Sequence, residues 1–117
     1  MITVDERMIL DLSRIADEIR AKKIDQLSIA EQMSDIEDEL QLLEAHHMLT
    51  VEGKNEAERK ARLALALAGD PEVRRLRATL REHERNFKMH EIEISDLRRR
   101  FAIAMARTQT QFPLNGL

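Results

Sequence analysis

The feature that most constrains the fold of this chain is a heptad repeat of apolar residues, in which positions a and d recur along two long stretches. Such a repeat places the apolar side chains on one stripe of a helix, and two such helices bury their stripes against each other. In the first stretch the a positions are Leu12, Ile19, Gln26, Met33, Leu40 and His47, and the d positions are Met8, Ile15, Lys22, Ile29, Ile36 and Leu43. Only Lys22 and Gln26 interrupt this seam.

The second stretch, from Val73 onward, is the more regular of the two. Its a positions are Val73, Leu80, Phe87, Ile94 and Phe101, and its d positions are Leu76, His83, His90, Leu97 and Ala104. A helix over residues 73–104 is on the order of 50 Å long, which is too long for a compact globule. The repeats therefore predict an all-α fold, an antiparallel coiled coil or helical bundle of long helices, completed by oligomerisation.

Helix-capping patterns divide the chain into elements. Thr3 with Glu6 has the spacing of a capping box, and the same spacing recurs at Asn55 with Glu58. Pro71 after an aspartate is typical of a first helical turn. These signals predict helices over residues 4–22, 28–49, 56–68 and 71–107 in one domain, 1–107, followed by a flexible tail over 108–117.

Two places in this scheme carry a specific expectation. Ser28 with Glu31 also has capping-box spacing, so residues 4–49 form either one helix or two, and we favour a break near residues 23–27. Gly53 lies in the turn TVEGKN and is expected to end the preceding helix in the left-handed conformation.

The composition indicates a folded, soluble protein of the cell interior. Apolar residues make up 43% of the chain and charged residues 35%, whereas aromatic residues make up 3%. The absence of cysteine excludes disulfides and thiolate metal sites, and favours a reducing, cytoplasmic location. No signal peptide and no apolar run long enough to span a membrane is recognisable, so we expect no membrane partner.

The charge is distributed unevenly along the chain. Residues 1–52 hold 13 acids and 5 bases, whereas residues 53–117 hold 14 bases and 9 acids. Within the last predicted helix the positive excess lies on the outward positions. The candidate contacts for nucleic acid or another anionic partner are Lys54, Arg59, Lys60, Arg62, Arg74, Arg81, Arg85, Lys88 and Arg99. The simpler alternative is a solvated face with weak ion pairs.

Part of the outward face of the last helix is apolar. Met89, Ile92 and Ile103 fall at outward positions there, and a single hairpin would leave them in water. We therefore expect self-association, most simply a homodimer, through Met89, Ile92, Phe101 and Ile103.

The sequence contains no pattern that indicates catalysis. His83 and His90 are about 10 Å apart along the helix axis, too far to share one metal ion, and are expected to be seam residues. Glu44 and His47 form a single Glu-x-x-His, whereas di-iron carboxylate bundles need two. We expect no enzyme activity, no catalytic residue, no metal, no cofactor and no small-molecule substrate.

The run GKNEAERKARLALALAGDPEVRRLR, residues 53–77, followed by a long charged helix, resembles small coiled-coil proteins of bacteriophages and prophages. The resemblance implies a small accessory protein that acts by binding in the host cytoplasm, and it assigns no functional residues. The leading hypothesis is therefore a phage-type accessory factor that contacts DNA, or proteins on DNA, through its basic C-terminal half. The alternative is a protein inhibitor of a host nuclease or antiviral defence complex, which would use the acidic N-terminal half.

Overall fold

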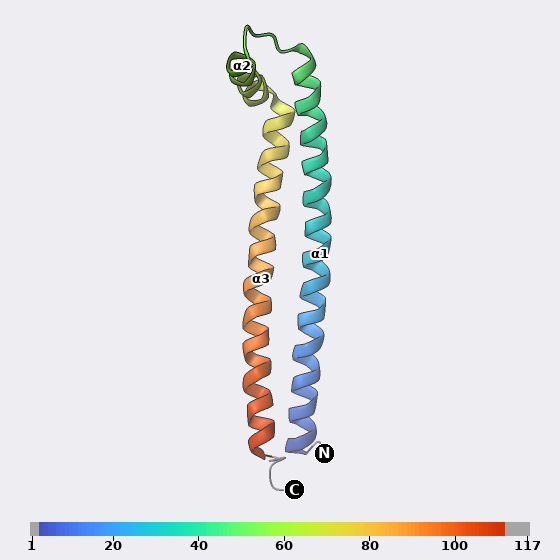
Figure 1. Ribbon diagram of the computed structural model, residues 1–117. Helices are drawn as coiled ribbons and strands as arrows, with labels where there is room; N and C mark the ends of the chain where they lie inside the picture. The colour runs from blue at the N-terminus through green and yellow to red at the C-terminus, as the bar shows by residue number, and fades with distance from the viewer. Residues whose placement is uncertain (1–2, 112–117) are drawn as a thin grey trace. The chain divides into compact units, whose positions relative to one another are not determined.

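The computed structural model describes residues 3–111, and it contains three α-helices and no strand within that range (Figure 1). They are α1 (Val4–Thr50), α2 (Glu56–Gly69) and α3 (Pro71–Gln111). The predicted all-α fold class is confirmed.

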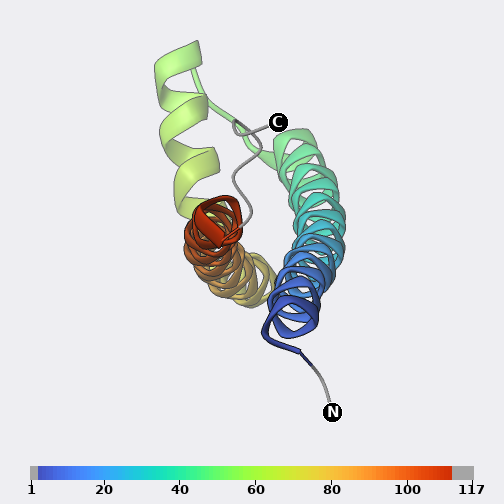
Figure 2. The ribbon, with the colours of Figure 1, turned by 90° about the horizontal axis from the view of Figure 1, so that it is seen from below.

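The described residues divide into two compact units. Among the described residues, the first unit combines residues 3–28, which include the first part of α1, with residues 88–111 of α3. The second unit comprises residues 29–87, which include α2. In each unit α1 and α3 lie side by side and run in opposite directions (Figure 1). In the second unit α2 lies across the direction of α1 and α3, and residues 51–55 connect it to the end of α1 (Figure 2).

The heptad frames predict the packed face of both long helices correctly. Every a and d position of α1 from Met8 to His47 is half-buried, and every a and d position of α3 from Val73 to Ala104 is buried or half-buried. The antiparallel coiled-coil pairing of the two helices is confirmed within each unit. Completion of the fold by a further copy stays a prediction.

The buried core is small. In the second unit it consists of Leu67, Val73 and Leu76, and in the first unit of Ile94 and Leu97. α1 contributes no buried residue at all, so its seam is covered on one side only. Two helices in contact leave much of each seam partly exposed, because full burial of a helix face needs neighbours on both sides of the contact.

The predicted break near residues 23–27 is wrong, because α1 runs from Val4 to Thr50 without interruption. No glycine or proline occurs in this stretch, so nothing in the backbone opposes the helix. The polar seam position Lys22 is satisfied by an ion pair with Glu93 of α3. Ser28 and Glu31 lie inside the helix, where their spacing has no capping role.

The predicted caps at the starts of α1 and α2 are present. Glu6 N donates to Thr3 Oγ1 at 3.1 Å, and Thr3 N donates to Glu6 Oε2 at 3.4 Å, which is a reciprocal capping box. Asn55 Oδ1 accepts from Glu58 N at 2.8 Å. Glu58 reaches back to Lys54 N at 3.2 Å, one residue earlier than a capping box requires.

The expectation that Gly53 is left-handed is wrong, because no described glycine has a positive φ. The glycine is needed for space instead. A Cβ at position 53 would lie 2.8 Å from Arg59 N, which belongs to the first turn of α2. A side chain there would push the 51–55 connection away from α2.

The last helix is longer than predicted. α3 continues to Gln111, so residues 108–111 of the expected flexible tail are helical, and the rest of that tail lies outside the described residues. The hydroxyls of Thr108 and Thr110 donate to the carbonyls of Ala104 and Ala106 at 2.9 Å. The seam also continues, since Thr108 occupies the next a position and is half-buried.

Among the described residues, none of the helices combines the length and apolarity that crossing a membrane requires.

Candidate functional site

Two of the four cations predicted at the start of α2, Lys60 and Arg62, are occupied by contacts within the second unit. Lys60 forms an ion pair with Glu56 at 3.3 Å, and Arg62 forms one with Glu58 at 2.8 Å. Arg62 also donates to the carbonyl of Glu52 at 3.0 Å, which fixes the 51–55 connection against α2.

The other two members of this predicted group, Lys54 and Arg59, have exposed side chains that form no ion pair within the described residues. Arg59 and Lys60 line a small groove of about 190 Å³ together with Glu56 and the apolar side chains of Met48, Val51 and Leu63. The α2 group therefore places two free cations beside two paired ones.

The strongest candidate for contact with an anion is the outward face of α3 in the second unit. Arg74, Arg81 and Arg85 are exposed there, and none of them forms an ion pair among the residues that the structure describes. They lie seven and four residues apart, on one side of the helix, over about 16 Å. We call these three residues the arginine face.

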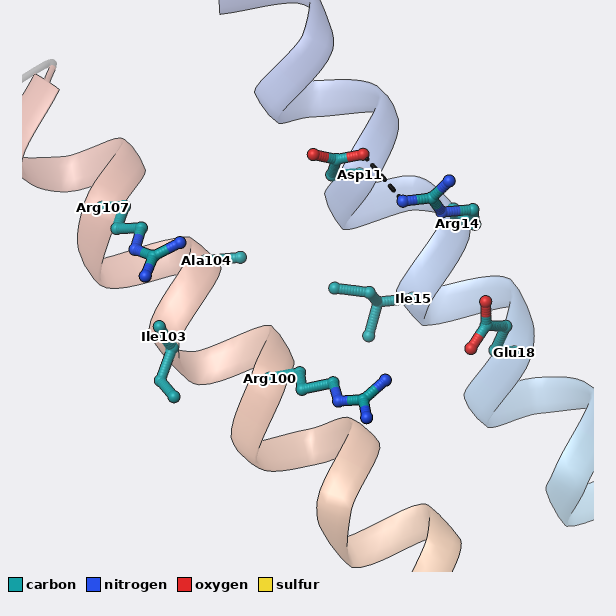
Figure 3. Close-up of a pocket in the computed structure, with 8 residues that line it drawn as sticks. All are labelled: Asp11, Arg14, Ile15, Glu18, Arg100, Ile103, Ala104 and Arg107. Atoms are coloured by element: carbon teal, nitrogen blue, oxygen red, sulfur yellow. Dashed lines mark hydrogen bonds and ion pairs between the residues drawn. The ribbon is translucent and has the colours of Figure 1, made fainter.

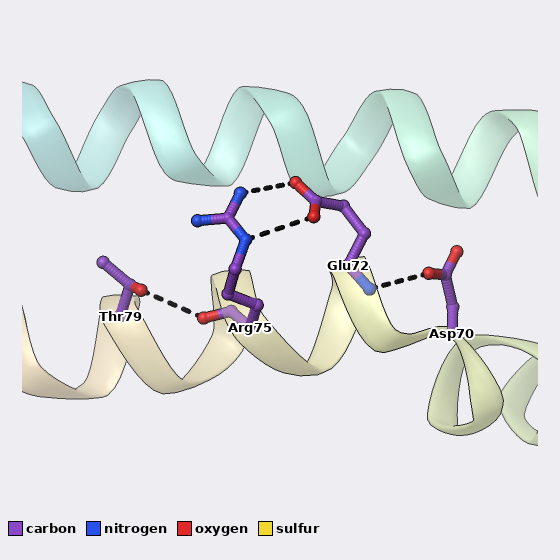
Figure 4. A network of polar contacts seen from close by, with 4 residues as sticks. All are labelled: Asp70, Glu72, Arg75 and Thr79. Atoms are coloured by element: carbon purple, nitrogen blue, oxygen red, sulfur yellow. Dashed lines mark hydrogen bonds and ion pairs between the residues drawn. The ribbon is translucent and has the colours of Figure 1, made fainter.

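Arg75, on the same helix, is a paired arginine and contrasts with the arginine face. Its guanidinium binds both carboxylate oxygens of Glu72, with Nε to Oε2 at 3.1 Å and Nη2 to Oε1 at 2.5 Å (Figure 4). This arrangement lowers the pKa of Glu72, chiefly through the hydrogen bond from Arg75. The members of the arginine face have no such partner and remain available for phosphate oxygens.

The last two predicted cations, Lys88 and Arg99, belong to the first unit. Both are exposed, but Arg99 Nη1 lies 3.9 Å from Asp96 Oδ1 on the same helix. The basic residues predicted from sequence are thus divided between the two units, and the arginine face gathers three of the unpaired ones on one helix face.

The part of α1 in the second unit carries the opposite charge. Residues 29–50 contain six acids and no lysine or arginine. All six are exposed, and none forms an ion pair within the described residues. They are Glu31, Asp35, Glu37, Asp38, Glu39 and Glu44. We call them the acidic face.

The histidines do not form a common site. His83 and His90 are half-buried at seam positions, as expected. The rings of His46 and His47 have centroids 6.3 Å apart in an edge-to-face arrangement. Within residues 3–111 no three His, Asp or Glu side chains are grouped so that they could hold a metal ion.

Sequence reasoning did not anticipate that His47 meets Asp70. His47 Nε2 lies 2.7 Å from Asp70 Oδ2. The other oxygen of Asp70, Oδ1, accepts from Glu72 N at 2.9 Å and so caps α3 (Figure 4). The hydrogen bond from His47 is the main cause that lowers the pKa of Asp70, and the backbone N–H of Glu72 adds to it.

A second unanticipated contact joins α1 to α3 in the first unit. Lys22 and Glu93 form an ion pair between half-buried side chains. The contact raises the pKa of Lys22 and lowers that of Glu93, in both cases chiefly through the hydrogen bond between the two groups. Each residue was visible in the sequence, but only the register of the two helices brings them together.

The apolar residues predicted to mediate self-association occupy two different sides of α3. Met89, Ile92 and Ile103 are 51%, 56% and 48% exposed, whereas Phe101 is half-buried on the seam side. Phe101 is one turn from the buried Leu97 and is therefore part of the packed face, not of the outward one.

An open groove of about 510 Å³ lies between α1 and α3 in the first unit (Figure 3). Its walls carry both charges, with Asp11, Arg14 and Glu18 on α1 facing Arg100 and Arg107 on α3. Arg14 is paired with Asp11 at 3.0 Å. The mixture of charges favours water and ions over a specific small molecule.

Comparisons of the chain with protein-family models, with curated proteins and with solved structures find no match. The resemblance to phage coiled-coil proteins therefore stays a hypothesis, and the function is argued from the surfaces alone.

Proposed function

We propose that this chain is a non-enzymatic binding protein that contacts the phosphates of DNA through the arginine face of its second unit. The observation that carries the proposal is that Arg74, Arg81 and Arg85 are exposed and unpaired, while Arg62 and Arg75 of the same unit are paired. Unpaired guanidinium groups on one helix face are suited to phosphate oxygens, which they bind in a bidentate manner.

The spacing of the arginine face sets the scale of the contact. The distance of about 16 Å from Arg74 to Arg85 corresponds to roughly five base pairs along a duplex. A rigid helix therefore presents three cations to a short stretch of backbone. Contacts of this kind hold a protein on DNA but do not read its sequence.

The composition indicates recognition of the backbone rather than of bases. The chain has no Trp or Tyr, and aromatic residues make up only 3% of it. Stacking on aromatic rings is the usual way to hold unpaired bases. We therefore assign the chain a sequence-independent contact with DNA, as expected of an accessory factor that works beside other DNA-bound proteins.

A charge-reversal experiment tests this assignment. The variant Arg74→Glu, Arg81→Glu, Arg85→Glu is expected to lose binding to a short labelled duplex in fluorescence anisotropy. The matched control is Arg7→Glu, Arg20→Glu, Lys23→Glu, which reverses three exposed cations of α1 that form no ion pair within the described residues. Both variants change the net charge equally, so only a local contact distinguishes them.

The control is expected to retain most of the binding, because it leaves the arginine face intact. The general repulsion between an acidic chain and DNA rises equally in both variants and does not distinguish them. Equal loss in both variants would show that total charge alone governs binding, and the assignment of the arginine face would then be wrong.

A second function is favoured by the acidic face. Six exposed, unpaired acids on residues 29–50 suit a basic groove on a protein, which is the kind of surface that binds DNA in a nuclease or defence complex. In this role the chain would act as a protein inhibitor. Replacing Glu31, Asp35 and Asp38 with lysine is expected to abolish inhibition of such a nuclease, whereas the arginine-face variant keeps it.

A further inference from the structure

The outward side of α3 in the first unit carries a second stripe of residues, distinct from the seam with α1. Its members follow one another at alternating steps of three and four residues, which is the spacing of a coiled-coil seam. The outer stripe consists of Met89, Ile92, Asp96, Arg99, Ile103 and Ala106.

This stripe is exposed in the chain on its own. Ile92 is 56% exposed and Met89 51%, and the side chains of Asp96 and Arg99 are 58% and 73% exposed. In Figure 3, Ala104 and Arg100 point from α3 toward α1, whereas Ile103 points to another side of the helix. The outer stripe therefore has the spacing of a helix interface. Within the described residues Asp96 and Arg99 pair with each other at 3.9 Å, and Ile103 and Ala106 also line open grooves that residues of α1 share.

The order of residues along the stripe identifies the partner. We propose that a second copy of this chain binds the outer stripe in antiparallel orientation, with the two-fold axis passing midway between Leu97 and Arg98. The chain then forms a homodimer through α3.

The argument rests on the symmetry of the stripe about that midpoint. Asp96 and Arg99 are equally far from it, as are Ile92 and Ile103. An antiparallel copy consequently places each isoleucine opposite the partner's other isoleucine. The outermost pair, Met89 and Ala106, matches a large residue with a small one. A two-fold interface requires such self-complementarity, whereas an unrelated partner would impose no such order.

The charges favour the antiparallel orientation over the parallel one. In the antiparallel pair, Asp96 lies opposite the partner's Arg99, and the symmetry repeats this contact on the other side of the axis. In a parallel pair in register, Asp96 would face the partner's Asp96. A polar pair at the centre of an apolar seam fixes register and orientation in coiled coils.

Phe101, which we expected to take part in self-association, lies on the seam side and is not in this interface.

The first test is the mass of the full chain in solution, measured by sedimentation velocity over a range of concentrations. A dimer in equilibrium with monomer is expected. The variant Ile92→Ser, Ile103→Ser removes four apolar side chains from each dimer and is expected to weaken association by roughly a hundredfold or more. The control Leu10→Ser, Ile24→Ser changes two residues of α1 that are 55% and 60% exposed, and is expected to leave association unchanged.

The second test determines the orientation, and it is simplified by the absence of cysteine from the chain. One preparation carries Ile92→Cys and another carries Ile103→Cys. Upon oxidation the mixture is expected to form the disulfide between unlike chains. Each preparation alone forms little, because like positions lie about 16 Å apart and a disulfide needs Cα atoms within roughly 7 Å.

The third test is a charge exchange. Asp96→Arg alone places arginines opposite each other and is expected to weaken the dimer, and Arg99→Asp alone is expected to do the same with aspartates. The double exchange Asp96→Arg, Arg99→Asp restores the opposite pairing and the dimer. Circular dichroism confirms that each variant stays helical.

A monomer at all concentrations would overturn the proposal. So would disulfides between like positions, or a dimer unaffected by the isoleucine variant. None of these measurements involves DNA, so their outcome is independent of the proposed function.

Discussion

The imidazole of His47 lies 2.7 Å from the carboxylate of Asp70, and this contact joins the last turn of α1 to the start of α3. Asp70 also ends α2, because its N–H donates to the carbonyl of Leu67 at 3.2 Å, and it caps α3 through Glu72 N. A single side chain and its backbone thus connect all three helices of the second unit.

The first prediction concerns the pH dependence of this junction. In the folded chain the pKa of Asp70 lies below its ordinary value of 3.8. The contacts of the charged side chain therefore stabilise the fold at pH values above 3.8. The stabilisation is lost as the pH falls through the lowered pKa. Asp70→Asn keeps a capping oxygen but removes the charge, and is expected to lower the Tm by a few degrees at neutral pH.

Thermal unfolding across the acid range checks this prediction. The difference in Tm between wild type and Asp70→Asn should disappear at pH values well below 3.8, where both side chains are neutral. Asp35→Asn, an exposed and unpaired aspartate in the same unit, is the control and should match wild type at neutral pH. A difference between Asp70→Asn and wild type that persists unchanged in acid would show that the charge plays no part.

The second prediction concerns the small core of the first unit. Leu97 is 6% exposed, and Leu97→Ala is expected to cost about 2–5 kcal/mol in the free energy of unfolding. Leu42 is 72% exposed, and Leu42→Ala is expected to change that free energy by less than about 0.5 kcal/mol. Urea unfolding measures both variants. Similar losses at the two sites would contradict the assignment of the packed face.

The third prediction concerns the continuity of α1. The amides of residues 23–27 form part of the helix and are expected to exchange slowly with solvent. The amides of Glu52 and Gly53, in the connection between α1 and α2, are expected to exchange quickly. Hydrogen exchange followed by mass spectrometry compares the two segments. Equally fast exchange in both segments would contradict a continuous α1 and support a break near residues 23–27.

The fourth prediction concerns the ion pair between Lys22 and Glu93. Lys22→Glu places two carboxylates together at half-buried positions and is expected to lower the Tm by several degrees. The exchange Lys22→Glu, Glu93→Lys restores opposite charges and should recover most of the loss. Failure of the double variant to recover stability would show that the two side chains do not meet.

The packed faces could be predicted from the sequence because they depend on a local period. Each heptad frame needs only the order of residues in one helix, and it correctly identifies buried residues such as Leu76 and Leu97. Caps such as Thr3 and Asn55 are local in the same way, since donor and acceptor lie three residues apart.

The errors arose where distant residues decide the structure. Lys22 and Gln26 predict a break if α1 is considered alone, but Glu93 from α3 pairs with Lys22 and makes the continuous helix favourable. The contact of His47 with Asp70 also depends on distant residues, because the 51–55 connection and α2 separate the two in the sequence. The turn TVEGKN predicts a left-handed backbone at Gly53, whereas the glycine is required there by the close approach of Arg59.

The cations of the candidate site could be identified from the sequence, but which of them are paired with acids could not. All nine cations were visible in the sequence, yet their availability depends on which acids lie beside them. Intrahelical pairing of Lys60, Arg62 and Arg99 leaves the arginine face as the main group of unpaired cations.

The most direct test of DNA contact through the arginine face is the salt dependence of duplex binding by the wild-type chain. Three phosphate contacts predict that the logarithm of the binding constant falls with the logarithm of salt concentration with a slope of about −2.7. Arg81→Gln should reduce the slope by about 0.9, because one contact is removed. Absence of binding at low salt, or a slope that Arg81→Gln leaves unchanged, would contradict the proposed function.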